Sequence, residues 1–217
     1  METTILIAGT AGELYTELLN QSLSRQYNIA AALDPEAEHP VIEEDWAEML
    51  QYFRWNKSSA LSAKNLLLEV FSVVSELKEV FLIYQPPEDG RPLHEIPVVE
   101  TERVLDHWVK GYLFFVKELL LHFQRRKKGI LTFILQESYP SLSPLGLSTS
   151  AFFKGLGSAL FNHYQNEPFA LRGFHSQTSD IKDFISHLFS LEQRVDKTLG
   201  KWNKYSGKSS FWSFGRS

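Results

Sequence analysis

The feature that most constrains the fold of this chain lies in its first 25 residues. Residues 5–8 form a short apolar run, Gly9 and Gly12 follow within four positions, and a helical pattern of leucines begins directly afterwards. A strand that passes through a glycine turn into a helix is the opening of a βαβ unit. The chain is therefore expected to build a parallel sheet covered by helices.

The glycine spacing of this turn also bears on ligand binding. In the dinucleotide-binding fingerprint, the later glycines let the backbone approach a pyrophosphate and let the helix pack close to the strand. Glu13 and Tyr15 occupy those later positions here. A carboxylate at the helix N-terminus repels a diphosphate, and a phenol fills space that the cofactor or the strand would need. The turn therefore predicts a fold more strongly than it predicts a cofactor.

Composition excludes several classes of protein. The chain has 217 residues, of which 43% are hydrophobic and 22% are charged, as in a single soluble globular domain. Its net charge of -4 gives no nucleic-acid signature, and the absence of cysteine excludes a disulfide scaffold, thiol catalysis and cysteine-ligated metals. The seven histidines show no metal-ligand spacing. Because residues 1–8 do not resemble a signal peptide and no run is long enough to span a bilayer, we expect a cytoplasmic protein without membrane contact.

The rest of the chain alternates strand-like runs with helical periodicities. Strands are expected at 4–8, 28–33, 50–55, 79–84, 130–135 and 169–175. Helices are expected at 13–25, 59–77, 101–128, 149–165 and 180–201. This order predicts an α/β, Rossmann-like, doubly wound parallel sheet in three α/β/α layers. We expect one domain over residues 1–200 and a basic, aromatic tail over 201–217.

Three segments together resemble the short-chain dehydrogenase/reductase (SDR) family. Residues 8–15 are similar to the family's Thr-Gly-x-x-x-Gly-Ile/Leu-Gly turn. Residues 105–112, followed by the basic turn 125–129 and the strand 130–135, look like its long helix and the strand after it. Residues 148–156 look like the helix that carries its Tyr-x-x-x-Lys motif. The resemblance covers about residues 4–175 and implies a Rossmann-like fold with NAD(P)-dependent redox chemistry.

The resemblance also implies which side chains that chemistry would need. The family uses a Tyr as proton donor, a Lys that lowers its pKa, a Ser that polarises the substrate carbonyl and an Asn that organises a water. The matching positions hold Gly146, Ser150, Gln136 and Trp108, respectively. Tyr139 and Lys154 lie nearby, but their spacing would not place them on one helix face. The chain is therefore interpreted as a divergent member that lacks the catalytic residues, and no catalytic residue is predicted.

Gly9, Gly12 and Asp34 remain as candidate cofactor-binding residues. The two glycines could cradle a phosphate or an adenosine, or they could simply close a tight strand-to-helix turn. Asp34 follows the second expected strand, where an acid can bind a ribose hydroxyl, but an Asp before Pro35 is also an ordinary turn former. No cofactor is expected if the site is degenerate, and NAD(P) is expected if it is active.

The helices expected at 101–128 and 149–165 carry more apolar surface than one sheet face covers. The first has a wide apolar face, and the second places Ala151, Gly155 and Ala159 four residues apart. Such a row of small residues lets another helix approach closely. In the SDR family these two helices form a four-helix interface, so we expect a homodimer or a heterodimer with an SDR paralogue; packing within the chain is the alternative.

The tail has four basic residues, five aromatic residues and no acidic residue. That composition suits an anionic surface or a single-stranded nucleic acid, but docking of the aromatics on a protein domain is favoured because the whole chain is acidic. The main hypothesis is therefore a non-catalytic scaffold or regulatory subunit. The alternatives are an NAD(P)-dependent oxidoreductase with an atypical site, and a nucleotide or small-ligand sensor that uses Gly9, Gly12 and Asp34.

Overall fold

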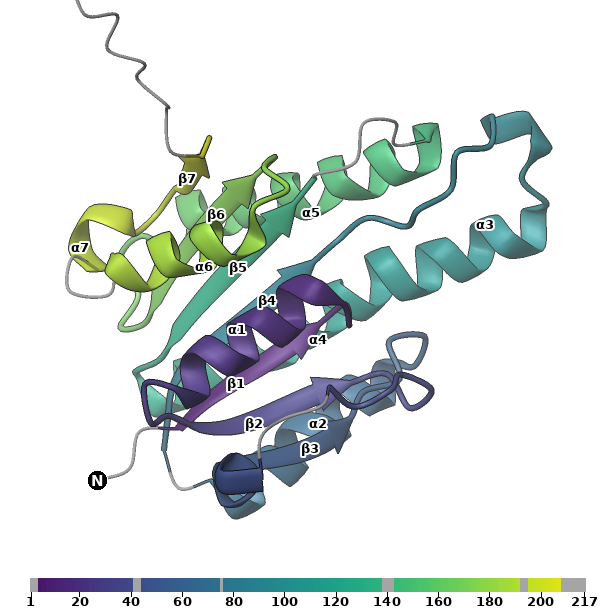
Figure 1. Cartoon of the computed structure of the whole chain (residues 1–217). Coiled ribbons are helices and arrows are strands. Elements are labelled where there is room, and N and C mark those ends of the chain that lie inside the picture. Colours follow the sequence, from purple (N-terminus) through teal and green to yellow (C-terminus); the bar gives the residue numbers. More distant parts are fainter. Residues whose placement is uncertain (1–3, 41–43, 75, 138–142, 192–194, 208–217) are drawn as a thin grey trace, which may run out of the picture.

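A computed structural model describes residues 4–40, 44–74, 76–137, 143–191 and 195–207. Within them a sheet of seven strands runs in the order β3-β2-β1-β4-β5-β6-β7, and every strand pair is parallel (Figure 1). The strands are β1 Thr4–Gly9, β2 Asn28–Leu33, β3 Leu50–Arg54, β4 Leu77–Tyr84, β5 Ile130–Gln136, β6 Ala170–Ser176 and β7 Trp202–Tyr205. The predicted Rossmann-like, doubly wound fold is confirmed.

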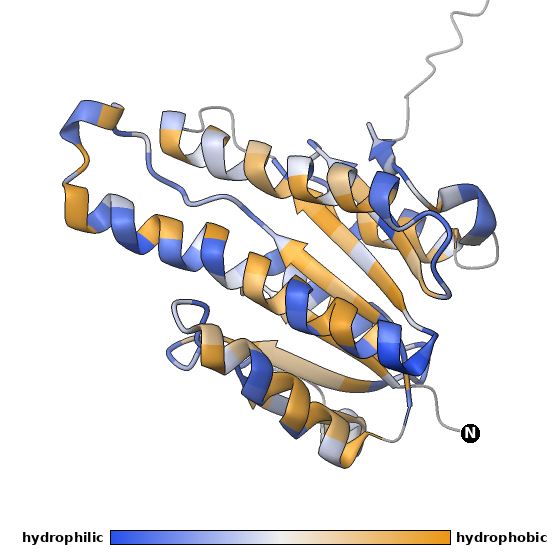
Figure 2. Ribbon diagram, turned by 180° about the vertical axis from the view of Figure 1, so that it is seen from behind, coloured by the Kyte–Doolittle hydropathy of each residue, from blue (hydrophilic) through white to orange (hydrophobic). Residues whose placement is uncertain are grey.

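Helices cover both faces of the sheet, which explains why the central strands are largely apolar, with the buried Arg172–Glu79 ion pair as an exception. Alternate strand residues point to opposite faces, and each face has its own buried cluster. One cluster lies under α1 (Glu13–Leu23) and α6 (Ile181–Ser190). The other lies under α2 (Ala60–Val73), α4 (Gly111–Arg126) and α5 (Pro144–His163), the side seen in Figure 2.

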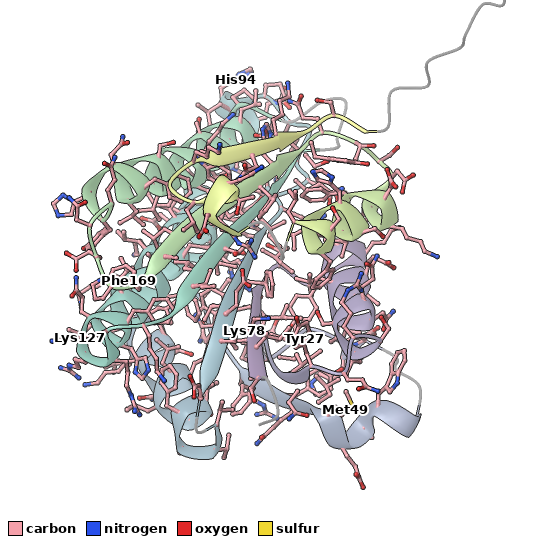
Figure 3. All side chains as sticks on the ribbon, turned by 90° about the vertical axis from the view of Figure 1, so that its left-hand side faces the viewer. Tyr27, Met49, Lys78, His94, Lys127 and Phe169 are labelled. Carbon is pink, nitrogen blue, oxygen red and sulfur yellow. The ribbon has the colours of Figure 1, made fainter. Side chains whose placement is uncertain are left out.

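The strand order reverses direction between β1 and β4. From β1 the chain builds outward through β2 and β3, then returns to β4 and continues through β5, β6 and β7. Figure 3 shows Tyr27, Met49, Lys78, Lys127 and Phe169 toward the amino ends of the strands, with His94 at the carboxyl end. In open α/β sheets, ligands bind at the carboxyl end beside such a reversal. The candidate site is therefore sought between the ends of β1 and β4.

The long helix expected at 101–128 is divided. An α-helix, α3 (Val98–Val104), continues through a π-helical segment at Leu105–Lys110 into α4. At the end of the π-helical segment, Gly111 packs so closely that a Cβ there would lie 2.5 Å from the Lys57 carbonyl oxygen. Short 3-10 segments occur at Glu44–Met49 and Leu93–Glu95. Gly111 therefore lies where this helix crosses the loop that contains Lys57, and the crossing leaves no room for a side chain at position 111.

The helix predicted over residues 180–201 is wrong beyond residue 190. The structure has α6 to Ser190, a short α7 at Val195–Thr198, and then β7. β7 pairs with β6, so the compact domain extends past the predicted boundary at 200, at least to Tyr205. Residues 208–217 of the predicted tail lie outside the described residues.

Trp202 fixes β7 to the rest of the domain. Its indole N–H donates to the Lys154 carbonyl at 3.1 Å, within α5. Its ring covers Gly173 of β6 and Gly157 of α5, where an added Cβ would lie 2.5 Å and 2.7 Å from ring carbons, respectively. The Trp202 side chain of β7 therefore packs within the chain, against α5 and β6.

This packing predicts different effects for one substitution at two glycines of the same helix. Gly157→Ala would push a methyl group into Trp202 and should destabilise the fold by about 1–3 kcal/mol. Gly155→Ala meets open space and should gain up to about 1 kcal/mol from helix propensity. Urea unfolding of both variants checks this, and equal stabilities would contradict the packing of Trp202.

Candidate functional site

The glycine turn lies at the carboxyl end of β1, as expected. Gly9 has φ +143°, and a Cβ there would lie 2.1 Å from the Ile83 carbonyl oxygen, so only glycine fits. Gly12 also has positive φ, is exposed, and precedes the first turn of α1. Both glycines therefore have a structural role in closing the turn, whether or not a ligand is bound.

Glu13 is exposed to solvent, whereas Tyr15 is buried in the core. Glu13 is exposed at the start of α1, where its carboxylate would face an approaching diphosphate. Tyr15 is completely buried and its hydroxyl donates to the Ile7 carbonyl at 3.1 Å. Burial raises the pKa of Tyr15 well above its usual value, so the phenol stays neutral. Tyr15 thus fills space between helix and strands.

A chain of hydroxyl contacts ties the turn to α4. The Tyr112 hydroxyl donates to the Ile83 carbonyl at 2.9 Å and lies 2.9 Å from the Thr10 hydroxyl. The Gln85 backbone N–H donates to that Thr10 hydroxyl at 3.4 Å. Tyr112 is completely buried, and burial raises its pKa well above the usual value. These contacts hold the glycine turn, the end of β4 and α4 in one arrangement.

Asp34, the predicted ribose-binding residue, forms an ion pair within the chain. Its carboxylate accepts a hydrogen bond from the Lys57 ammonium and lies 3.3 Å from the His107 Nε2. The Lys57 side chain is completely buried, whereas that of Asp34 is 24% exposed. Lys57 follows β3, and His107 belongs to the π-helical segment. Sequence reasoning missed both partners because they lie far from Asp34 along the chain.

The contacts with Lys57 and His107 lower the pKa of Asp34. Burial works to raise it, but hydrogen bonds with His107 and Lys57 and their charges outweigh burial and hold the pKa below its usual value. Burial lowers the pKa of Lys57, and Asp34 opposes that effect. Lys57 and His107 both contact the Oδ2 oxygen of Asp34, so a ribose hydroxyl bound to that oxygen would compete with a buried ammonium.

Glutamine side chains cover the region beside the glycine turn. The Gln85 amide donates to the Gln136 side-chain oxygen at 3.1 Å, and the Gln136 amide donates to the Thr178 carbonyl at 3.2 Å. A Cβ on Gly12 would lie 3.2 Å from the Gln85 side-chain oxygen. The Trp108 indole N–H donates to the Gln85 carbonyl at 2.9 Å. Gln136 and Trp108, predicted in the places of Ser and Asn, thus support Gln85.

The α5 positions predicted in the places of Tyr and Lys carry no acid–base pair. The Gly146 backbone N–H donates to the Ser143 hydroxyl, which caps α5. The Ser150 hydroxyl is buried next to the Glu137 carboxylate. Lys154 is exposed on α5, and Tyr139 lies outside the described residues. The described residues therefore do not assemble the tyrosine–lysine pair that the resemblance implies.

One ionisable pair at this edge was not predicted. His175 Nε2 lies 2.7 Å from a Glu137 carboxylate oxygen, and both residues are at the carboxyl ends of adjacent strands. The hydrogen bond with His175 holds the pKa of Glu137 below its usual value. The strand-end position of both residues was the available signal, but neither forms a motif. Because the carboxylate lies between the imidazole and Ser150, the arrangement does not activate the Ser150 hydroxyl as a nucleophile.

Other features of the described residues limit the chemistry. No group of three or more His, Asp or Glu side chains within them is placed to hold a metal ion. No helix within them is long and apolar enough to cross a bilayer. Grooves lie between α2 and α4, between α4 and α5, along β3 and the start of α2, and toward the amino ends of the strands; Gly9, Gly12 and Asp34 do not line these grooves.

Comparison with solved structures identifies the fold. A short chain dehydrogenase from Leptospira borgpetersenii serovar Hardjo-bovis with bound NAD+ has a TM-score of 0.78 at 14% identity, covering 94% of this chain and 91% of the other. A 3-ketoacyl-(acyl-carrier-protein) reductase from Brucella melitensis, complexed with NADH, has a TM-score of 0.80 at 10% identity, covering 95% and 97%. ElxO with NADP bound has a TM-score of 0.73 at 14% identity, covering 95% and 98%.

Sequence comparison adds no closer relative. No protein-family model and no curated protein matches this sequence. The first two structures are described as a dehydrogenase and a reductase, and all three hold a nicotinamide cofactor by their own descriptions. At these identities the likeness extends to the fold, and this chain has the Rossmann-like, single-domain α/β fold of short-chain dehydrogenases.

The Asp34–Lys57 pair predicts a pH-dependent loss of stability. Lys57→Met leaves the half-buried carboxylate without its buried partner and should cost about 1–3 kcal/mol at neutral pH. In the unaltered chain, the pKa of Asp34 is lower in the folded state than its usual value, so the ionised carboxylate stabilises the fold at any pH above that usual value. This stabilisation is lost as the pH falls through the lowered pKa of the folded state. The difference between the two proteins should therefore shrink in acid, as measured by urea unfolding at several pH values.

A double variant provides the control. Asp34→Asn with Lys57→Met removes both charges and should be more stable at neutral pH than Lys57→Met alone. If the single variant were as stable as the double variant, Asp34 would not depend on Lys57.

Proposed function

We propose that this chain is a non-redox protein on the fold of short-chain dehydrogenases, acting as a scaffold or regulatory subunit. One observation carries the proposal: side chains of the chain itself bind the groups that a cofactor would use. Asp34 is paired with Lys57 and His107, and the Gln85 side chain lies beside Gly12. We expect nucleotide entry to break these contacts, and no tyrosine–lysine pair among the described residues would reward it with redox chemistry.

The proposed contact surface lies on α4 and α5. Ala151, Gly155 and Ala159 are exposed along α5, and a Cβ at Gly155 would meet nothing within 4 Å. Between the two helices is a groove of about 380 Å³, lined largely by leucines. Leu113 is 40% exposed beside it. These features support association through α4 and α5, as a homodimer or with a paralogue of the same fold.

The second candidate is an NAD(P)-dependent oxidoreductase with an atypical site. The comparisons favour it more directly than the first, because the similar structures hold NAD+, NADH or NADP. Gly9, Gly12 and Asp34 would then contact the cofactor after His107 and Gln85 move aside. A sensor that binds only the adenosine part would use the same three residues.

Titration with NADH and NADPH separates these candidates. We expect neither to change its nicotinamide fluorescence on addition of the purified chain up to about millimolar concentration, which bounds the affinity near 4 kcal/mol. Binding of either dinucleotide would overturn the non-redox proposal. Binding of AMP or ADP alone, measured by calorimetry, would identify a sensor.

Substitution of Gly155 tests the association surface. Gly155→Leu fills the small-residue row and should shift the chain toward monomer in light scattering, with a dimer dissociation constant weakened roughly tenfold or more. Gly155→Ala keeps the row small and serves as the control. A monomeric unaltered chain at micromolar concentration, or normal association of Gly155→Leu, would contradict the proposed surface.

A further inference from the structure

We propose that the groove between α2 and α4 binds a partner protein through an amphipathic helix with acidic flanks. The groove has a volume of about 310 Å³, and the residues that carry the argument are Lys64, Leu68, Phe71, Leu121, His122 and Arg125. We call it the α2/α4 groove. The inference rests on the proposed function, because it names the kind of partner that the scaffold would recruit, but it concerns a surface separate from the Gly155 row.

The floor and rim of the α2/α4 groove are apolar. Leu68 is 60% exposed and Leu121 is 43% exposed, one on each helix. Leu61 is 72% exposed and lies seven residues, two helical turns, before Leu68. The Phe71 and His122 rings stack at 3.5 Å and 4°. The α2/α4 groove thus has exposed leucines on both of its helices, and an apolar groove of this kind accepts the apolar face of an amphipathic helix.

His122 contributes an uncharged ring to this floor. Burial lowers its pKa, and the charges of Arg126 and Arg125 lower it further. At neutral pH its imidazole is therefore neutral. The stacked pair joins α2 to α4 in the lining of the groove, and the cations at the margins supply the charge.

The margins of the groove are positive. Neither Lys64 nor Arg125 forms an ion pair with a carboxylate in the described part of the chain, and Glu118 is bonded to Lys117 at 2.7 Å. Helices α2, α4 and α5 together carry more cations than anions: Lys64, Lys117, Arg125, Arg126 and Lys154 against Glu69 and Glu118. The whole chain has a net charge of -4. A partner with acidic flanks complements this face.

Charge and shape favour a helix of another protein over the other occupants. A second copy that approached through the same groove would set Lys64 and Arg125 against like charges. A bilayer would contact a broad surface, whereas the apolar side chains here line a concave strip between two helices that run side by side (Figure 2). The strip is suited to one helix with leucines on one face.

Peptide binding to the full chain tests the proposal. The probe is a fluorescein-labelled synthetic helix with Leu at positions i, i+3, i+4 and i+7 and Glu on both flanks; a matched peptide carries Lys instead of Glu. By fluorescence anisotropy, the Glu peptide should bind roughly tenfold more tightly than the Lys peptide. Leu68→Glu, at a leucine that lines the α2/α4 groove and not the groove between α4 and α5, should weaken its binding roughly tenfold. Leu93→Glu, at a 52% exposed leucine outside the groove, should leave binding unchanged.

A charge exchange supplies the decisive comparison. Lys64→Glu with Arg125→Glu should reverse the preference, so that the Lys peptide binds more tightly. Equal binding of the two peptides, or loss of binding in Leu93→Glu as well, would overturn the proposal. Binding to phosphatidylglycerol vesicles that Leu68→Glu abolishes would assign the surface to lipid and overturn it too. These outcomes are independent of NADH binding and of the Gly155→Leu result, which test the proposed function.

Discussion

The arrangement of the whole carboxyl edge depends on how closely β1 and β4 approach each other. Gly9 is packed against the Ile83 carbonyl, which accepts hydrogen bonds from both the Thr10 backbone N–H and the Tyr112 hydroxyl. One carbonyl therefore joins the glycine turn, the end of β4 and α4. A side chain at position 9 would separate the two strands and break both bonds. The glycine is required by this contact alone, so its presence carries no information about a ligand.

Several polar side chains at this edge form hydrogen bonds with one another. Asp34 is bonded to Lys57, and the Gln85 and Gln136 amides are bonded together. His107 is 26% exposed and could turn away from Asp34, but Lys57 is completely buried. A ligand that displaced Lys57 from Asp34 would leave a buried charge without a partner, which costs several kcal/mol. A dinucleotide would have to recover that cost through contacts elsewhere, beside the Glu13 carboxylate.

Much of the fold could be predicted from the sequence because local periodicity decides it. The strand at Asn28–Leu33 and the glycine turn follow from runs of apolar residues and from glycine spacing. Asp34 was placed at the correct edge, but its partners Lys57 and His107 come from segments that no local pattern connects. The close approach of Gly111 to the Lys57 carbonyl, directly after the π-helical segment, likewise joins segments that no local pattern connects. β7 was hidden in a short basic and aromatic run whose burial depends on two distant glycines, Gly157 and Gly173.

The carboxyl ends of the strands and the surface of α2, α4 and α5 differ in what a ligand or partner would have to displace. At the strand ends, Asp34 and Gln85 are bonded within the chain, so a ligand that took either would first displace those contacts, whereas the buried Trp55 indole N–H has no hydrogen-bond partner among the described residues. On α2, α4 and α5, leucines are left in water and Lys64 and Arg125 lack carboxylate partners among the described residues. Binding there displaces water from apolar surface and breaks no buried ion pair. We therefore propose contacts on the helices rather than at the strand ends, although the fold is one in which the strand ends ordinarily hold the ligand.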